Sequence, residues 1–157
     1  MRRAHRERTW RYGRPRGLLF GVLILLGGLT LIVNAWSVVD SKMTLDSASR
    51  EFVRAYTDQN NPVSARTEGE KAARGTLRTR SAFLGDARIT LEEPNGFGPC
   101  STVTVTISAD VPAMKAPFID RFTPVSVSST ISELTPAHRE MENDSRYDPD
   151  VTECFGD

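Results

Sequence analysis

The hydrophobic pattern opens with a long apolar run. Residues 18–39 are 22 consecutive residues without a charge, and twelve of the sixteen in 18–33 are Leu, Ile, Val or Phe. A helix rises about 1.5 Å per residue, so this run measures roughly 33 Å, about the thickness of a bilayer hydrocarbon core. The pattern predicts a transmembrane helix over residues 17–39. A helix buried in a soluble core is the alternative, which would not explain the basic residues before the run.

Apolar residues continue past the run at helical spacing. They recur at steps of three or four residues at Leu45, Ala48, Phe52 and Ala55. This spacing is typical of an amphipathic helix, and no proline occurs between Pro15 and Pro62. We therefore predict one helix from about Gly17 to Thr57, whose outer half needs an apolar partner. A second helix is predicted over Val63–Phe83, weakened by two internal glycines.

After Gly85 apolar and polar residues alternate, as in half-buried strands. The alternation is clearest in Thr102–Val111, where Val and Ile alternate with Thr and Ser, and it recurs in Ala87–Leu91 and Val125–Leu134. The predicted fold is α+β and pilin-like. It consists of a transmembrane helix that continues into an amphipathic helix, a second helix, and a small antiparallel sheet of three or four strands. The amphipathic helix should cover the apolar face of the sheet.

The charge distribution predicts the topology. Residues 1–16 hold seven arginines and one glutamate, and positively charged flanks stay in the cytoplasm. This predicts a basic cytoplasmic segment (1–16), the membrane span (17–39), an exported α+β domain (40–134) and an acidic tail (135–157). Localisation is then the cell membrane, single-pass, with the N-terminus cytoplasmic and residues 40–157 extracellular. The adjacent span explains the arginines more simply than nucleic-acid binding does, so no nucleic acid is expected.

A cleavable signal peptide is the rival interpretation of the same run. Val33-Asn34-Ala35 has small residues at the positions that a signal peptidase reads for a cut after Ala35. The alternative function is thus a small extracellular binding module released by that cut. The apolar run is longer than the usual 7–15 residues of a signal peptide, which favours a retained anchor.

Few residues are candidates for catalysis, metal binding or disulfide formation. The only two cysteines, Cys100 and Cys154, lie on the exported side and are predicted to form a disulfide, with two free thiols as the alternative. His138 is the only exported histidine, and no metal-binding spacing is present. Glu92 and Glu93 look like ordinary surface charges. We expect no catalytic residue, no metal and no cofactor, and the polar, acidic segment Asn143–Asp157 should be held only by whatever Cys154 bonds.

Several segments together resemble a known family. They are Arg14-Pro-Arg-Gly17, Asp46–Arg54, Cys100–Pro112, Ala116-Pro-Phe118 and Val125–Glu133, followed by Arg139. In this order and spacing, over residues 14–139, they are similar to the TadE/TadG-like pilus-assembly proteins of high-GC Gram-positive bacteria. Those proteins are pseudopilin-like components of the tight-adherence (Flp-type) pilus system.

The resemblance implies a non-enzymatic role in assembly. The expected partners are the lipid bilayer and other pilus or secretion-system subunits, with a candidate homo-oligomer through the transmembrane helix at Gly17-x-x-x-Gly21. Gly17 also occupies the position of prepilin-type processing. Prepilins have a glutamate five residues after the cut, whereas this chain has Val22. We therefore expect an uncleaved anchor.

Overall fold

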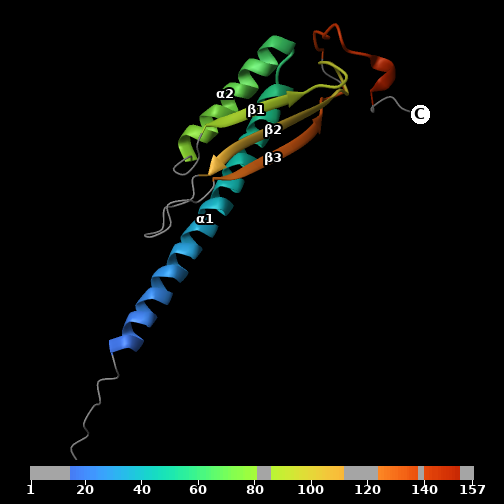
Figure 1. Ribbon diagram of the computed structural model, residues 1–157. Coiled ribbons are helices and arrows are strands. Elements are labelled where there is room, and N and C mark those ends of the chain that lie inside the picture. Colours follow the sequence, from blue (N-terminus) through green and yellow to red (C-terminus); the bar gives the residue numbers. More distant parts are fainter. Residues whose placement is uncertain (1–14, 81–85, 112–123, 138–139, 153–157) are drawn as a thin grey trace, which may run out of the picture.

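The structure is a computed structural model that describes residues 15–80, 86–111, 124–137 and 140–152 (Figure 1). Its elements follow the chain as helices α1 (Pro15–Thr57) and α2 (Pro62–Arg80), strands β1 (Ala87–Glu92), β2 (Thr102–Val111) and β3 (Val125–Leu134), and the short helix η1 (Pro149–Val151). The predicted α+β layout is confirmed. The predicted end of the second helix, residues 81–83, lies outside the described residues.

Helix α1 is unbroken over 43 residues, so it is about 65 Å long. Its first half extends away from all other elements, and its second half packs against α2 and the sheet (Figure 1). We call Gly17–Trp36 the apolar half. The described residues from Ser37 onward form the head, and we call its last part, residues 140–152, the C-terminal segment.

The turn between the helices follows from local chemistry. Pro62 cannot continue a helix but suits the first turn of one, because its missing N–H needs no partner there. The Asn61 side chain accepts hydrogen bonds from the N–H groups of Val63 (2.9 Å) and Ser64 (3.3 Å). Asn61 thereby caps α2 and starts it in a new direction.

The sheet is antiparallel in the order β1-β2-β3. Strand β2 is central, with Ile107 opposite Ile89 on one side and Ser129 on the other. Its apolar residues are buried on the face that packs on α1, namely Val103, Val105, Ile107, Ala109 and Val111. The other face carries hydroxyl groups that pair between strands, as in Thr106–Thr130 (2.9 Å).

The core is centred on aromatic residues of α1. Phe52 stacks on Tyr56 (centroids 6.1 Å apart), and Tyr56 meets Phe97 edge to face (5.5 Å). Gly69 of α2 lies directly on Phe52, since a Cβ there would come within 3.1 Å of its ring. This glycine disfavours helix on intrinsic grounds, but it allows α2 to approach α1 closely.

Candidate functional site

The apolar half of α1 is the first functional feature. Large side chains along it are exposed, with exposed fractions of 70% at Leu23, 73% at Leu31 and 69% at Trp36. Its most apolar window of 18 residues has no buried residue. Water strongly disfavours such a surface on a soluble monomer. By length and composition the helix can cross a membrane, which is compatible with a single-pass anchor.

Polar residues in the apolar half are satisfied within the helix. Thr30 Oγ1 donates to the Leu26 carbonyl (2.8 Å), and Asn34 Nδ2 donates to the Thr30 carbonyl (2.9 Å). In lipid every polar group must find an internal partner, because no water is available. These two side chains therefore fit a membrane environment.

The head begins directly where the apolar half ends. Ser37 is 5% exposed, and Ser41 and Thr44 are also buried on the side of α1 that faces the head. On other sides of the same turns, Val39 and Met43 remain exposed. No flexible linker separates the apolar half from the head, since α1 is helical throughout.

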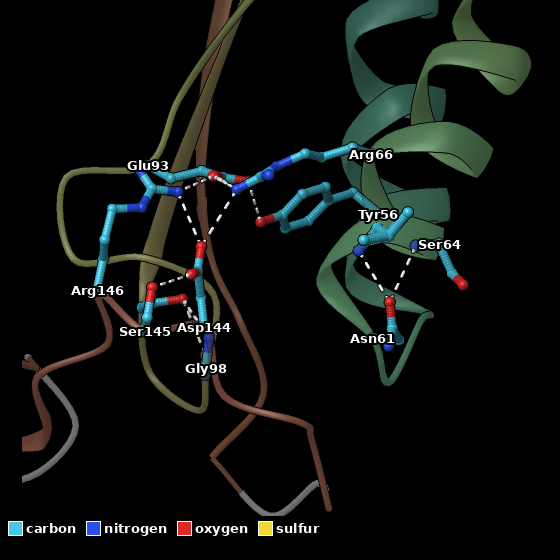
Figure 2. A network of polar contacts seen from close by, with 11 residues as sticks. Tyr56, Asn61, Ser64, Arg66, Glu93, Gly98, Asp144, Ser145 and Arg146 are labelled. Atoms are coloured by element: carbon cyan, nitrogen blue, oxygen red, sulfur yellow. Dashed lines mark hydrogen bonds and ion pairs between the residues drawn. The ribbon is translucent and has the colours of Figure 1, made fainter.

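The second feature is a charged cluster at the end of the head far from the apolar half (Figures 1 and 2). We call it the Glu93 cluster. Its five side chains come from α1, α2, the loop after β1 and the C-terminal segment: Tyr56, Arg66, Glu93, Asp144 and Arg146. Residues far apart in the sequence thus meet at one carboxylate.

Glu93 is the centre of this cluster. Tyr56 Oη donates to its Oε1 at 2.6 Å, and Arg66 binds both carboxylate oxygens. Arg146 Nη2 donates to Glu93 Oε2 and to Asp144 Oδ2, each at 2.9 Å. Arg66 also contacts Asp144, at 3.3 Å. Two guanidinium groups are therefore balanced by two carboxylates (Figure 2).

The electrostatics fit a carboxylate that stays ionised. The Glu93 side chain is only 5% exposed, and this burial alone would raise its pKa. Hydrogen bonds from Arg66, Tyr56 and Arg146 outweigh burial and hold the pKa of Glu93 below its ordinary value of 4.5. The hydrogen bond from Arg146 likewise lowers the pKa of Asp144. Such a carboxylate is a poor proton donor or acceptor near neutral pH, and its oxygens are already engaged.

The interpretation of Glu93 as an ordinary surface charge is therefore wrong. Glu92 is the last residue of β1 and is exposed, whereas Glu93 lies just beyond the strand and turns into the cluster. Sequence reasoning missed it because Arg66 is 27 residues away and Arg146 is 53 residues away. No local pattern marks partners at such separations.

The C-terminal segment is bound to the rest of the head by its own contacts. Backbone N–H groups of Glu142 and Asp144 donate to Asn60 and Phe97 carbonyls (2.8 and 2.9 Å). The expectation that Cys154 alone holds the tail from Asn143 onward is thus wrong for residues 143–152. The reason is that Arg146, a basic residue in an acidic tail, pairs with Glu93 after β1, and that Asp144 of the tail pairs with Arg66 of α2.

Tyr147 packs closely against the β1–β2 connection. Its hydroxyl donates to the Pro99 carbonyl at 2.9 Å, and its ring covers Gly98. A Cβ on Gly98 would come within 2.2 Å of that ring. Only glycine fits under the ring at this position, so the connection and the tail are complementary in shape.

The structure describes some, but not all, of the other residues that the sequence analysis singled out. Gly17 lies near the start of α1 with no neighbouring atom within 4 Å of an added Cβ. Cys100 is buried, next to the end of β3, where its N–H donates to the Thr135 carbonyl. Cys154 and His138 lie outside the described residues. Within the part of the chain that the structure describes, no group of three His, Cys, Asp or Glu residues could hold a metal ion.

The Cys100–Cys154 disulfide stays a prediction, tested on gels. Without reductant the chain should run faster than the reduced chain, since a loop of about 53 residues remains closed. Cys154→Ser should abolish the difference, and Ser101→Ala, beside Cys100, should keep it as a control. Alkylation of both thiols in the untreated protein would contradict the bridge.

Comparison with known proteins yields no relative. No family model, no curated protein and no solved structure matches the chain. The class of protein is therefore defined by the structure of the chain alone. It is an α+β head on a helix whose other half is exposed and apolar.

Proposed function

We propose that this chain is a membrane-anchored, non-enzymatic, pseudopilin-like subunit of a tight-adherence pilus or a related secretion assembly. The observation that carries the proposal is the continuity of α1. One half of this helix is exposed and apolar. The other half of the same helix is packed into the head. A head built directly on its anchor moves with it as one body, which suits a subunit that is positioned by other subunits.

The orientation belongs to the proposal as well. Seven arginines precede the apolar half, and such a flank remains on the cytoplasmic side. The head would then lie outside the cell. The Glu93 cluster supports a structural role for the head, because its buried carboxylate is committed to holding the C-terminal segment.

Anchoring is tested by fractionation. The wild-type chain should stay in the membrane pellet after an alkaline carbonate wash, and a C-terminal tag should be accessible to protease added to intact spheroplasts. Replacing both Leu25 and Leu29 with arginine should release the chain or block its export, because each arginine at a span centre costs about 2.5–3.5 kcal/mol. Val63→Arg, on the exposed surface of α2, is the matched control and should fractionate like wild type.

The assembly role needs its own test. Deletion of the gene should abolish surface pili, and the full chain should restore them. The head alone, exported on a cleavable signal peptide and without the apolar half, should not restore pili. Normal piliation in the deletion strain would contradict the proposal, while recovery of the wild-type chain as a soluble protein would contradict the anchor.

One observation favours the alternative, a binding module released after Ala35. Burial in the head begins at Ser37, two residues after that cut, so cleavage would leave the packing of the head intact. The intact mass of the chain, measured in both the membrane fraction and the culture medium, decides between them. A chain that begins at Trp36, and that becomes longer in Ala35→Leu, would establish the released module.

A further inference from the structure

Strand β1 is an edge strand, because only β2 pairs with it (Figure 1). In an antiparallel pair only alternate residues exchange backbone hydrogen bonds, and the backbone groups of the others point to the opposite side. The Thr135 N–H donates to the Ser101 carbonyl at the end of the β2–β3 ladder, and the Ser128 carbonyl accepts from Lys42 of α1. The odd-numbered residues of β3 therefore bond to β2, and the even-numbered ones face away from it.

The register carries this alternation across the sheet to β1. Since β2 bonds to β3 through its odd-numbered residues, it bonds to β1 through its even-numbered ones. Their partners in β1 are Arg88, Thr90 and Glu92. The N–H and C=O groups of the other residues of β1, namely Ala87, Ile89 and Leu91, consequently point outward from the sheet. Within the described part of the chain, no hydrogen bond reaches them from that side.

The opposite edge of the sheet is protected. Strand β3 packs on α1, and the Lys42 ammonium bonds to the outward carbonyl of Ser128. A lysine at an edge is one of the means by which proteins prevent the addition of a further strand. Strand β1 has no such cover among the described elements, since α2 packs on α1 and makes little contact with β1.

The apolar face of the sheet is also incomplete at β1. Ile107 and Val105 of β2 are 0% exposed, whereas their partners in β1, Ile89 and Leu91, are only half-buried. A strand added beside β1 would cover these two side chains with its own apolar residues. It would also give the sheet the fourth strand that the sequence allows.

We propose that β1 binds an extended segment of a partner protein, which joins the sheet as an antiparallel fourth strand. The outward N–H and C=O groups of β1 supply the hydrogen bonds, as in other complexes that form by strand addition. Arg88 and Glu92 supply the specificity. Both are exposed on the outer face of the sheet, and neither forms an ion pair among the described residues.

These two charges define the chemistry of the bound segment. Antiparallel pairing places the residue opposite Glu92 four positions before the residue opposite Arg88. Opposite charges directly across two strands stabilise the pair, and like charges destabilise it. The matching segment therefore has a basic residue, an acidic residue four positions later, and apolar residues opposite Ile89 and Leu91.

A second copy in the same membrane cannot provide this strand. Its own β1 has the matching order of charges, but antiparallel pairing would invert that copy, because the strands run along α1 (Figure 1). Its apolar half would then point away from the bilayer. This exclusion rests on the proposed anchoring, whereas the open edge itself does not. The partner is therefore a different protein, which deepens the proposed role in assembly.

Peptide binding to the full-length chain in detergent tests this edge. The probe is the labelled heptapeptide Thr-Lys-Val-Thr-Val-Glu-Thr, blocked at both ends, and a second peptide exchanges its Lys and Glu. Wild type should bind the first peptide at least about tenfold more tightly, which corresponds to about 1.4 kcal/mol. The double variant Arg88→Glu, Glu92→Lys should prefer the second peptide. Exchange of an exposed ion pair of α2, Glu68→Lys with Lys71→Glu, is the matched control and should leave the preference unchanged.

A proline shows whether the outward backbone groups take part. Ile89→Pro removes an outward N–H but no bond to β2, and edge strands accept proline at such positions. It should bind the first peptide at least about tenfold more weakly than Ile89→Ala, which loses the side chain but keeps the N–H. Equal binding by the two variants, or binding by wild type without a charge preference, would overturn the proposal. If Ile89→Pro does not fold, the charge exchange decides alone.

Amide exchange in the free chain is the second measurement. The N–H groups of Ile89 and Leu91 should exchange fast and those of Arg88 and Thr90 slowly, and bound peptide should protect Ile89 and Leu91. Protection of both in the free chain would show that another part of the chain already covers the edge. A homodimer cross-linked through Thr90→Cys in native membranes, above the wild-type background, would show a second copy there. Either result overturns strand addition by a partner and leaves the anchor intact, whereas normal piliation in the deletion strain contradicts only the proposed function.

Discussion

Replacing Val105 or Ile107 with aspartate unfolds the head. Both side chains are 0% exposed and lie on the face of β2 that packs on α1. An aspartate there would be an unpaired charge in an apolar core, and the loss should exceed about 4 kcal/mol, a large share of the stability of a small domain. Purified full-length protein in detergent should lose its protease-resistant head fragment and its cooperative urea transition.

Thr106→Asp is the control for this prediction. Thr106 lies between the two buried residues but on the outer, hydroxylated face, where its hydroxyl bonds to Thr130. The aspartate can remain hydrated there, so the loss should stay near the 0.5–1.5 kcal/mol of one hydrogen bond. An unchanged protease pattern in Val105→Asp, or equal damage in Thr106→Asp, would show that the faces of the sheet are assigned wrongly.

Glu93→Gln will loosen the C-terminal segment. The amide removes the charge that Arg66 and Arg146 share and leaves one acceptor where the carboxylate had two. Since hydrogen bonds to charged groups contribute roughly 1.5–3 kcal/mol, we expect a loss of about 2–3 kcal/mol in unfolding free energy. Protease should also cleave after Arg146 or Tyr147 before the rest of the head opens. Glu92→Gln, on the neighbouring exposed residue, is the matched control.

The same carboxylate sets a pH dependence. The pKa of Glu93 is lower in the folded protein than its ordinary value of 4.5, so ionised Glu93 favours the folded state. This stabilisation is fully present above pH 4.5 and is lost as the pH falls below 4.5 through the folded-state pKa. Urea midpoints measured downward through this window should therefore fall more steeply for wild type and Glu92→Gln than for Glu93→Gln. Parallel curves for Glu93→Gln and wild type would show that the cluster does not stabilise the head.

Local patterns in the sequence determined the elements. The apolar run and the absence of proline until Pro62 predicted one long helix, and α1 spans Pro15–Thr57. Strict alternation in Thr102–Val111 predicted a strand with one buried face, and the burial of β2 alternates in that way. These predictions succeed because periodicity and proline act within a few residues of chain, so their consequences can be read without knowing the fold.

Tertiary structure alone decided how the elements are joined. Glu93 stands beside Glu92 in the sequence, yet only Glu93 meets Arg66 and Arg146, whose positions depend on how α2 and the C-terminal segment return to the loop after β1. Gly98 is essential only because the Tyr147 ring lies on it. The open side of α1 at Met43 is likewise defined by where the head packs. Contacts between distant residues depend on the whole path of the chain, and no short segment contains that path.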